Sequence, residues 1–518
     1  MMEILPRPAS LEDRAAGPEI WVDEAIWGHR LYDEQTPWLT LLEFLGVLNA
    51  QHAEGKALRE AQLNSLSYVP QTQLRLRNLL FNNPHMATVL ASGLSDEGMW
   101  TDWLVKMAKG AGGLTDPSFA YLKEQFASFR DFDAVVSFLR SSAIEGDSNK
   151  RWSSKFVFPF GPDAFYEDLE VKANGGSTND RRFFARSGEL LYLMLCRSKA
   201  AEALRPLLIE RFLASETPYN GLVAALQGET QRAQNARTGA YLPCATHTAF
   251  DRLGNDWLAI LHLNMPVYDA LPHLMAVTGL NILLYQLERA AELTGRAEPI
   301  AFVCEIVSPK RSVVRDLSAD CFQENNVLPQ QAIERFIRRT EQDPDWQRAA
   351  HSDGAGLAAA EFLEGRFDWP DVDSREGLLD QAPAKLLEEL VAKANNRHKQ
   401  HVGKVHATWA RLIGLSSRRS SRRIRYAPTD RLLKTLVVAC VDNRMEYKDF
   451  LDRLHGRYGL IVGHLQAARA IAAGAADQKD FEENARRLEE RLASLGLLKR
   501  LSDSCAYVEN PFQRKLSA

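Results

Sequence analysis

The sequence predicts a mainly α-helical protein with minor β structure, a multidomain helical protein that ends in a C-terminal winged-helix-like domain. Apolar residues recur at helical spacing through most of the chain, and strand-like runs are few and short. A length of 518 residues exceeds what one hydrophobic core usually organises. Hydrophobic residues make up 45% and charged residues 25%, which is ordinary for a soluble globular protein and argues against a disordered or fibrous chain.

Shifts in composition divide the chain into four segments. A stretch rich in Asp, Gly and Pro with weak periodicity is typical of an exposed connection between domains. We therefore predict a helical N-terminal domain over 1–150, a helical or α+β middle domain over 151–345, a linker over 346–390, and a basic segment followed by the winged-helix-like domain over 391–518.

Individual elements follow from the apolar period and from the residues that start and stop helices and strands. In the first two segments we expect helices at 38–51 and 118–144, a strand at 155–160, helices over 181–213 with a break near Pro206, a buried helix at 272–295 and a buried strand within 299–309. In the last segment we expect helices at 429–441, 445–459, 464–474 and 480–496, then a strand–turn–strand over 497–512. Compact helices closed by a hairpin have the layout of a winged helix.

The most informative stretch for function is 393–429, which contains no Asp or Glu and carries ten Lys or Arg residues. The whole chain has a formal charge of −4, so the residues outside this stretch carry −14 once these ten positive charges are set aside. A positive island on an acidic body is typical of a surface that binds a polyanion, most simply nucleic acid phosphate. The histidines of the stretch, His398, His401 and His406, are expected to extend the basic face.

Paired arginines separated by small residues, as in Arg418-Arg419-Ser-Ser-Arg422-Arg423, suit phosphate because the guanidinium fork matches its oxygens. Two other interpretations stay open, a solvated basic linker and a patch that docks on an acidic protein surface. The winged-helix-like domain is as suited to protein contacts as to reading bases, because its last helix is acidic as well as basic. The predicted nucleic-acid-binding residues are Lys399, Lys404, Arg411, Arg418, Arg419, Arg422, Arg423, Arg425, Lys499 and Arg500.

Catalytic and metal-binding patterns are weak, so we predict no catalytic residue, no metal and no cofactor. The pair Cys244 and His247 lacks the second ligand pair that structural zinc needs. Asp163 with Glu170 imitates part of a metal-nuclease string, but the spacing is short and the residues fit surface charges better. No P-loop, GxSxG or GxGxxG sequence occurs.

Six scattered cysteines without a CxxC pair suit reduced thiols in a cytoplasm. The N-terminus has no secretory signal pattern, and charges, Pro and Gly interrupt the best apolar stretch of the sequence. We therefore expect a cytoplasmic protein without a membrane span.

Three segments together resemble accessory proteins of bacterial multi-gene anti-phage systems of the methylation- or phosphorothioation-associated type. They are RRFFARSGELLYLMLCRS, PIAFVCEIVSPKRSVVRDLSADCFQENNVL and LASLGLLKRLSDSCAYVENPF. The resemblance implies a subunit that works beside other defence-system proteins on DNA and is not itself an enzyme.

The leading hypothesis is a non-catalytic subunit of an anti-phage complex that grips the phosphate backbone of duplex DNA through its C-terminal basic segment. A divergent metal-dependent nuclease and a protein–protein adaptor stay open as alternatives. Metal-dependent cleavage that is lost on changing Asp163 or Glu170 would favour the nuclease.

Overall fold

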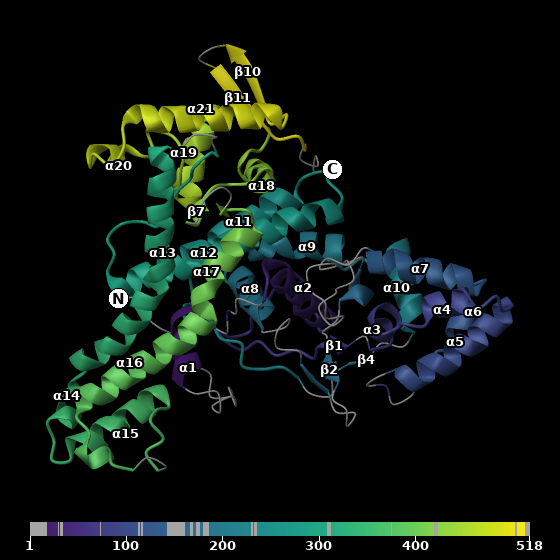
Figure 1. The fold of residues 1–518 in the computed structure, drawn as a ribbon, viewed down its shortest axis with the longest axis horizontal. Coiled ribbons are helices and arrows are strands. Elements are labelled where there is room, and N and C mark those ends of the chain that lie inside the picture. The colour runs from purple at the N-terminus through teal and green to yellow at the C-terminus, as the bar shows by residue number, and fades with distance from the viewer. Residues whose placement is uncertain are drawn as a thin grey trace. The chain divides into compact units, whose positions relative to one another are not determined.

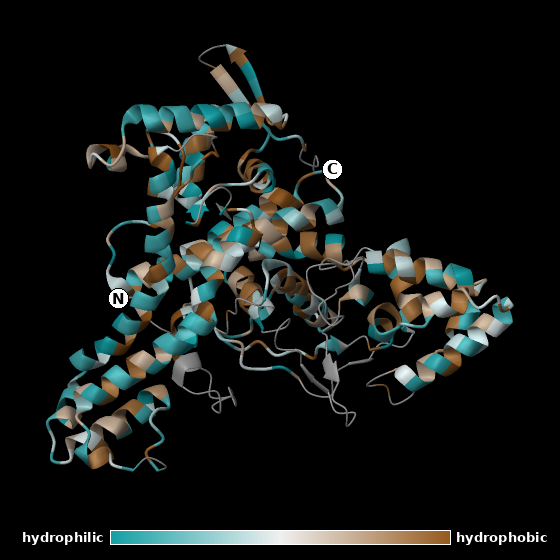
Figure 2. Cartoon of the chain, viewed as in Figure 1, coloured by the Kyte–Doolittle hydropathy of each residue, from teal (hydrophilic) through white to brown (hydrophobic). Residues whose placement is uncertain are grey.

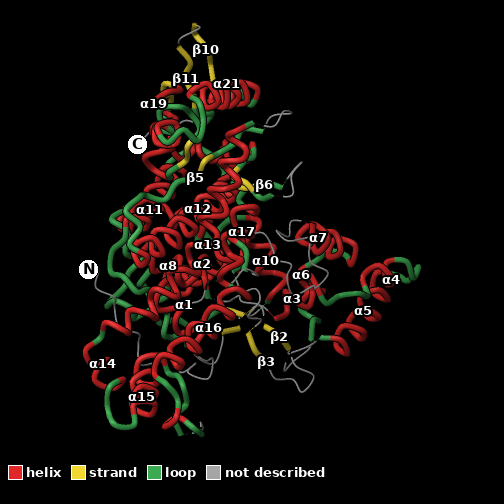
Figure 3. Tube along the Cα trace, turned by 60° about the vertical axis from the view of Figure 1, so that its left-hand side comes forward, coloured by secondary structure: helices red, strands yellow, loops and turns green. Residues whose placement is uncertain are grey.

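The computed structural model describes residues 18–28, 31, 35–72, 74–111, 114, 118–141, 161–165, 169–171, 177–179, 186–228, 231–232, 236–307, 312–373, 376–418, 423–502 and 505–512. Its fold is mainly helical with a few short strands, which confirms the predicted fold class (Figure 3). The contacts divide the chain into two compact units. Unit 1 comprises Met1–Pro37, Leu193–Leu204 and Gly239–Ala518, and unit 2 comprises Trp38–Tyr192 and Arg205–Thr238. The segment boundaries predicted at 150, 345 and 390 stay a prediction.

Unit 2 is built from helices with two small antiparallel ribbons. Its helices and strands are α2 (Pro37–Ala53), β1 (Gln71–Thr72), α3 (Leu74–Phe81), α4 (Met86–Leu90), α5 (Asp96–Gly110), α6 (Leu122–Gln125), α7 (Phe129–Ser141), η3 (Pro162–Ala164), β2 (Leu169–Val171), β3 (Ser177–Asn179), α10 (Pro218–Gln227) and β4 (Gln231–Arg232). Strand β1 pairs with β4, and β2 pairs with β3. An aromatic cluster of Trp100, Trp103, Phe129 and Phe132 fills part of its core.

Two expectations for unit 2 meet different outcomes. The helix expected over 118–144 is interrupted, because the backbone at Phe126 is extended. A new helix, α7, begins after Ser128, whose hydroxyl accepts a hydrogen bond from the backbone N–H of Asp131. The strand expected at 155–160 lies outside the described residues.

The predicted helices over 181–213 are α8 (Ser187–Cys196) and α9 (Ala201–Phe212). The expected break near Pro206 is wrong, because Pro206 lies inside α9. The chain breaks earlier, where the Ser198 hydroxyl accepts a hydrogen bond from the backbone N–H of Ala200. A serine that bonds to nearby backbone in this way competes with the helical hydrogen-bond pattern.

Unit 1 gathers the remaining elements (Figure 1). They are α1 (Pro18–Trp27), α11 (Thr248–Leu261), α12 (Val267–Thr294), β5 (Phe302–Val303), α13 (Val313–Arg338), η4 (Arg339–Gln342), α14 (Pro344–Ala350), α15 (Ala355–Phe367), η5 (Leu378–Asp380), α16 (Pro383–Gln400), α17 (Val402–Leu412), β6 (Ser416–Ser417), β7 (Arg425–Tyr426), α18 (Asp430–Cys440), β8 (Arg444–Glu446), α19 (Tyr447–Tyr458), β9 (Leu460–Ile461), α20 (Ala468–Ala472), α21 (Gln478–Ser494), β10 (Leu498–Ser502) and β11 (Cys505–Glu509).

Helix α12 is the centre of unit 1. It packs against α11, α13, α17 and α18, and its ribbon is largely apolar in Figure 2. By length and composition alone α12 could cross a membrane, but 72% of its most apolar window is buried inside the protein, as in the core helix of a globular fold. The buried helix predicted at 272–295 is therefore confirmed.

Glycine 279 lets α17 approach α12 closely. A Cβ atom at Gly279 would lie 2.5 Å from Cγ2 of Ile413, the residue that caps α17. Only a residue without a side chain leaves room for this contact, so Gly279 helps to fix the position of α17 on the core.

The strand predicted within 299–309 is confirmed as β5, which lies among helices in Figure 3 and pairs in parallel with β9. The Asn484 side chain of α21 forms hydrogen bonds with the backbone just after β5 and just after β9. Its Nδ2 donates to the carbonyl oxygens of Cys304 and Val462, each at 2.9 Å, and its Oδ1 accepts from the backbone N–H of Ile306 at 2.8 Å. One buried amide thus ties the C-terminal helix to the central strands.

The C-terminal elements follow the predicted order. Helices α18, α19 and α21 match the expected ranges 429–441, 445–459 and 480–496, and β10 with β11 forms the expected hairpin. Strand β8 adds to this hairpin to make a three-stranded antiparallel sheet in the order β10, β11, β8. The helix expected at 464–474 is shorter and covers only Ala468–Ala472, since residues 464–467 form a turn.

Candidate nucleic-acid interface

The basic segment folds as the end of α16, the whole of α17 and the short β6–β7 ribbon. Its chain leaves α16 at His401, whose φ of −131° and ψ of −83° are not helical, and then starts α17. Helix α17 buries Val402, Val405 and Trp409 against the core. The lysine and arginine of α17, Lys404 and Arg411, lie off this apolar stripe and are exposed.

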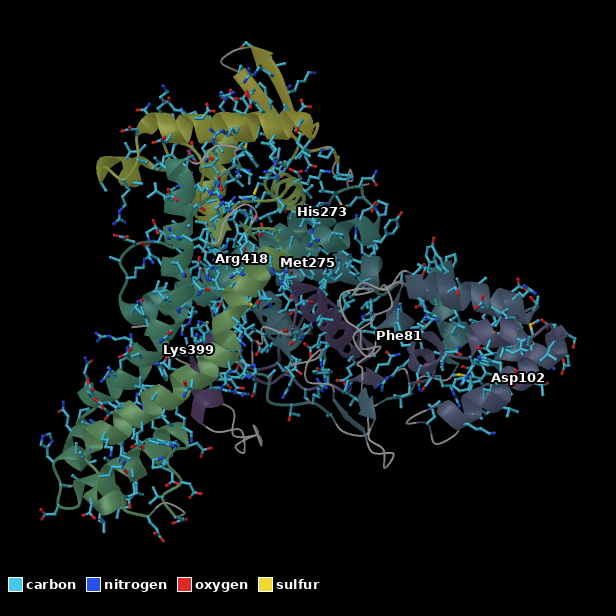
Figure 4. The ribbon with its side chains drawn as sticks, in the orientation of Figure 1. Phe81, Asp102, His273, Met275, Lys399 and Arg418 are labelled. Atoms are coloured by element: carbon cyan, nitrogen blue, oxygen red, sulfur yellow. The ribbon has the colours of Figure 1, made fainter. Side chains whose placement is uncertain are left out.

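Four exposed residues of the predicted binding set lie on or next to α17, and we call them the basic ridge: Lys404 and Arg411 are on α17, Lys399 is near the end of α16, and Arg418 follows β6. Lys404 and Arg411 are seven residues apart, which places them on one helix face about 10 Å apart along the axis. Figure 4 shows Lys399 and Arg418 at opposite ends of the α17 ribbon. The basic ridge thus consists of Lys399, Lys404, Arg411 and Arg418, all exposed.

Arg425 belongs to the interior and not to this surface. Its side chain is 1% exposed and its Nε makes an ion pair with Oε2 of Glu305, which is 0% exposed. A guanidinium buried against a carboxylate is already neutralised and has no access to a phosphate. Arg425 therefore does not contribute to the exposed basic surface that the sequence predicts.

Arg423 is exposed and forms an ion pair with Asp320 of α13. Arg500 of β10 donates from Nε and Nη2 to Oε1 of Glu489 on α21, at 3.0 and 2.6 Å. Lys499, its neighbour, is exposed. The predicted residues Arg419 and Arg422 lie outside the described residues.

Two of the three histidines of the basic segment do not extend the basic face. His398 is 2% exposed, stacks on Trp27 with ring centroids 5.6 Å apart, and places Nδ1 3.0 Å from Oδ1 of Asp23. His406 is 1% exposed, and burial lowers its pKa from 6.5 to about 4. Near neutral pH the imidazole of His406 is therefore uncharged, and its Nε2 is 2.9 Å from the Tyr426 hydroxyl.

The charges of α21 are largely paired with each other or with nearby residues. Arg486 bonds to Glu483 at 2.7 Å and also pairs with Glu490, while Arg487 lies 3.2 Å from Glu483. Arg491 reaches Asp430, the first residue of α18, at 2.6 Å. Because its arginines are engaged by carboxylates, this helix presents a mixed surface and not a basic one.

The candidate metal and nuclease residues are placed differently. His247 caps α11 by accepting from the backbone N–H of Ala249 at 3.1 Å, and Cys244 is buried near the Tyr285 hydroxyl. Asp163 accepts a hydrogen bond from Asn220 at 2.7 Å. Within the part of the chain that the structure describes, no three His, Cys, Asp or Glu side chains come together as metal ligands would.

No curated protein and no solved structure matches this chain. A family of known proteins does match part of it, from α17 to the end of β11, and this region contains most of the basic ridge and the three-stranded sheet. The matching family is described as Methylation-associated defense system protein MAD7, and residues 403–510 are similar to it, which confirms the resemblance to defence-system accessory proteins.

Proposed function

We propose that this protein is a non-catalytic, cytoplasmic subunit of a bacterial anti-phage complex and that it binds duplex DNA through the basic ridge. The observation that carries the proposal is that Lys399, Lys404, Arg411 and Arg418 are all exposed in a segment that has no acidic residue. The similarity of residues 403–510 to a methylation-associated defence family supports a role beside other subunits of such a system.

The chemistry of the ridge suits the phosphate backbone more than base edges. Lysine and arginine on one helix face meet successive phosphates, and such contacts position a protein without reading sequence. The rest of the protein is acidic, so long-range repulsion would orient the molecule with its ridge toward the nucleic acid.

A winged helix in the C-terminal region is part of the same proposal. The order α18, β8, α19, α21, β10, β11 and the sheet order β10, β11, β8 support this assignment. In this arrangement Lys499 lies in the hairpin that forms the wing, where it could add one more phosphate contact. The paired charges of α21 favour backbone contact over base recognition.

A second candidate function is docking on an acidic partner protein. Arg423 and Arg500 each already bind a carboxylate of this chain, Asp320 and Glu489, so carboxylates on another protein could occupy similar positions. Binding of a fluorescent duplex in the presence of increasing poly-glutamate, or of unlabelled duplex, separates the two functions. If the protein binds DNA, unlabelled duplex should displace the probe at a far lower concentration than poly-glutamate does, when both are expressed as moles of negative charge. The absence of any duplex binding at low salt would refute the proposal and favour the acidic partner.

A further inference from the structure

A cavity of about 560 Å³ lies in unit 1 between the start of α11, the second half of α12, residues 296–301 and the end of α19. Part of its wall is apolar and is formed by Leu284 and Ile300, which are 1% and 7% exposed. Gly459 allows residues 296–301 to lie against the end of α19, because a Cβ atom there would overlap the carbonyl oxygen of Ile300. The volume is within the range of pockets that bind small ligands.

The three glutamates that line the cavity are each paired with an arginine of this chain. Oε1 of Glu288 lies 3.0 Å from Nη1 of Arg252, which also lines the cavity. Glu292 and Glu298 pair with arginines outside the lining, Arg289 at 2.6 Å and Arg469. Their negative charges are therefore already compensated, although each carboxylate oxygen keeps a lone pair that can accept from a hydroxyl group.

Two other polar residues of the lining, Arg296 and His455, have side chains that find no partner among the described residues. Arg296 is half-buried and forms no ion pair with any of them, so it leaves the cavity with a surplus positive charge. His455, near the end of α19, is exposed, and its imidazole makes no hydrogen bond within the described part of the chain. Arg457 follows it, 25% exposed and held in place by an ion pair with Asp256, which is fully buried.

We propose that this cavity binds a phosphorylated sugar, either free or as part of a nucleotide. The donors come from two elements, residues 296–301 and α19, and a phosphate ester offers three oxygens to them where a carboxylate offers two. The guanidinium of Arg296 matches phosphate oxygens, and the imidazole of His455 always has an N–H to donate. Glu288 and Glu292 can accept from sugar hydroxyl groups, and the apolar wall covers the carbon skeleton. The proposal does not depend on DNA binding.

The test is calorimetric titration of the full chain with ribose 5-phosphate, the group that free sugar phosphates and nucleotides share. We expect it to bind at least about tenfold more tightly than ribose or inorganic phosphate, because each of these makes only part of the contacts. Ribonate, which carries a carboxylate on the same carbon chain, should bind more weakly. AMP in parallel separates the two sources, since tighter binding of AMP indicates a nucleotide and weaker binding a free sugar phosphate, and either order supports the proposal.

Two variants and one control locate the binding. Arg296→Gln should weaken binding about ten- to hundredfold, the range of a hydrogen bond to a charged group, and His455→Gln about two- to tenfold. Arg348→Gln removes an arginine that is 79% exposed on α14 and should leave binding unchanged. Absence of ribose 5-phosphate binding to the wild type, equal binding of ribonate, or full binding to Arg296→Gln would overturn the proposal. Displacement of ribose 5-phosphate by duplex DNA would also overturn it, because the cavity would then belong to the DNA interface.

Discussion

Replacing the basic ridge by glutamine should flatten the salt dependence of DNA binding. The variant changes Lys399, Lys404, Arg411 and Arg418, which are all exposed, so the fold should be retained. Glutamine keeps the length and the helix propensity of these side chains and removes only the charge.

The magnitude follows from the number of ridge charges. Each neutralised phosphate contributes about 0.9 to the slope of log affinity against log salt, so four contacts contribute about 3.6. Between about 50 and 200 mM salt, these four contacts alone account for a loss of about 150-fold in wild-type affinity. The glutamine variant should lose this part of the dependence and bind more weakly at every low salt concentration.

The assay is fluorescence anisotropy of a labelled duplex across the salt series. The control removes the same number of positive charges elsewhere, at Lys123, Lys199, Arg348 and Arg469, which are 44%, 91%, 79% and 71% exposed. If the control lowers the slope as much as the ridge variant does, net charge and not the ridge determines binding. A wild-type slope near zero would refute the electrostatic reasoning altogether.

Three further predictions concern the interior of unit 1. Burial lowers the pKa of His406 to about 4, so the unfolded chain binds the proton more tightly than the folded protein does. The free energy of unfolding should therefore fall by about 3 kcal/mol as the pH drops from 6.5 to 4. Urea titrations at each pH should show a smaller fall for His406→Gln. Gly279→Ala should lower the free energy of unfolding by about 1–3 kcal/mol, because the new Cβ presses on Ile413. The control Gly365→Ala, whose Cβ meets nothing within 4 Å, should stabilise α15. Equal melting temperatures of the two variants would contradict this. Arg425→Met should lower the free energy of unfolding by about 3–5 kcal/mol, because it leaves the buried carboxylate of Glu305 without its partner. The salt slope of DNA binding should not change. A lower slope would mean that Arg425 contacts the DNA.

The helices of the C-terminal region could be predicted because each has a strong apolar period and a clear start. The Thr429 hydroxyl accepts from the backbone N–H of Leu432, as expected of a threonine just before an apolar period, and Asp477 caps α21 slightly before the predicted start at 480. Helix α20 was predicted too long, since the turn before it depends on a contact between Gln466 and Asp452. Such contacts between side chains are not encoded in a local period.

The surface was harder to predict than the helices. Arg425 and its neighbours have the same local composition, and only the distant carboxylate of Glu305 separates the buried arginine from the exposed ones. One signal was present, because Glu305 is the single charge in an apolar run and a buried carboxylate needs a counterion. His398 and His406 likewise pack against residues far away in the sequence, Trp27 and Phe322.

The pairing of α1 with α16 has a consequence for synthesis of the chain. Trp27 stacks on His398 and donates from Nε1 to the carbonyl oxygen of Gln286, so α1 completes its contacts only after residue 398 has been made. At about 5–20 residues per second, a ribosome needs about 20–75 s to cover that distance. During this time α1 lacks its partner α16, although α12 and α13, which it also contacts, have already been made. The N-terminal helix can therefore complete its packing only after the chain has been made as far as α16.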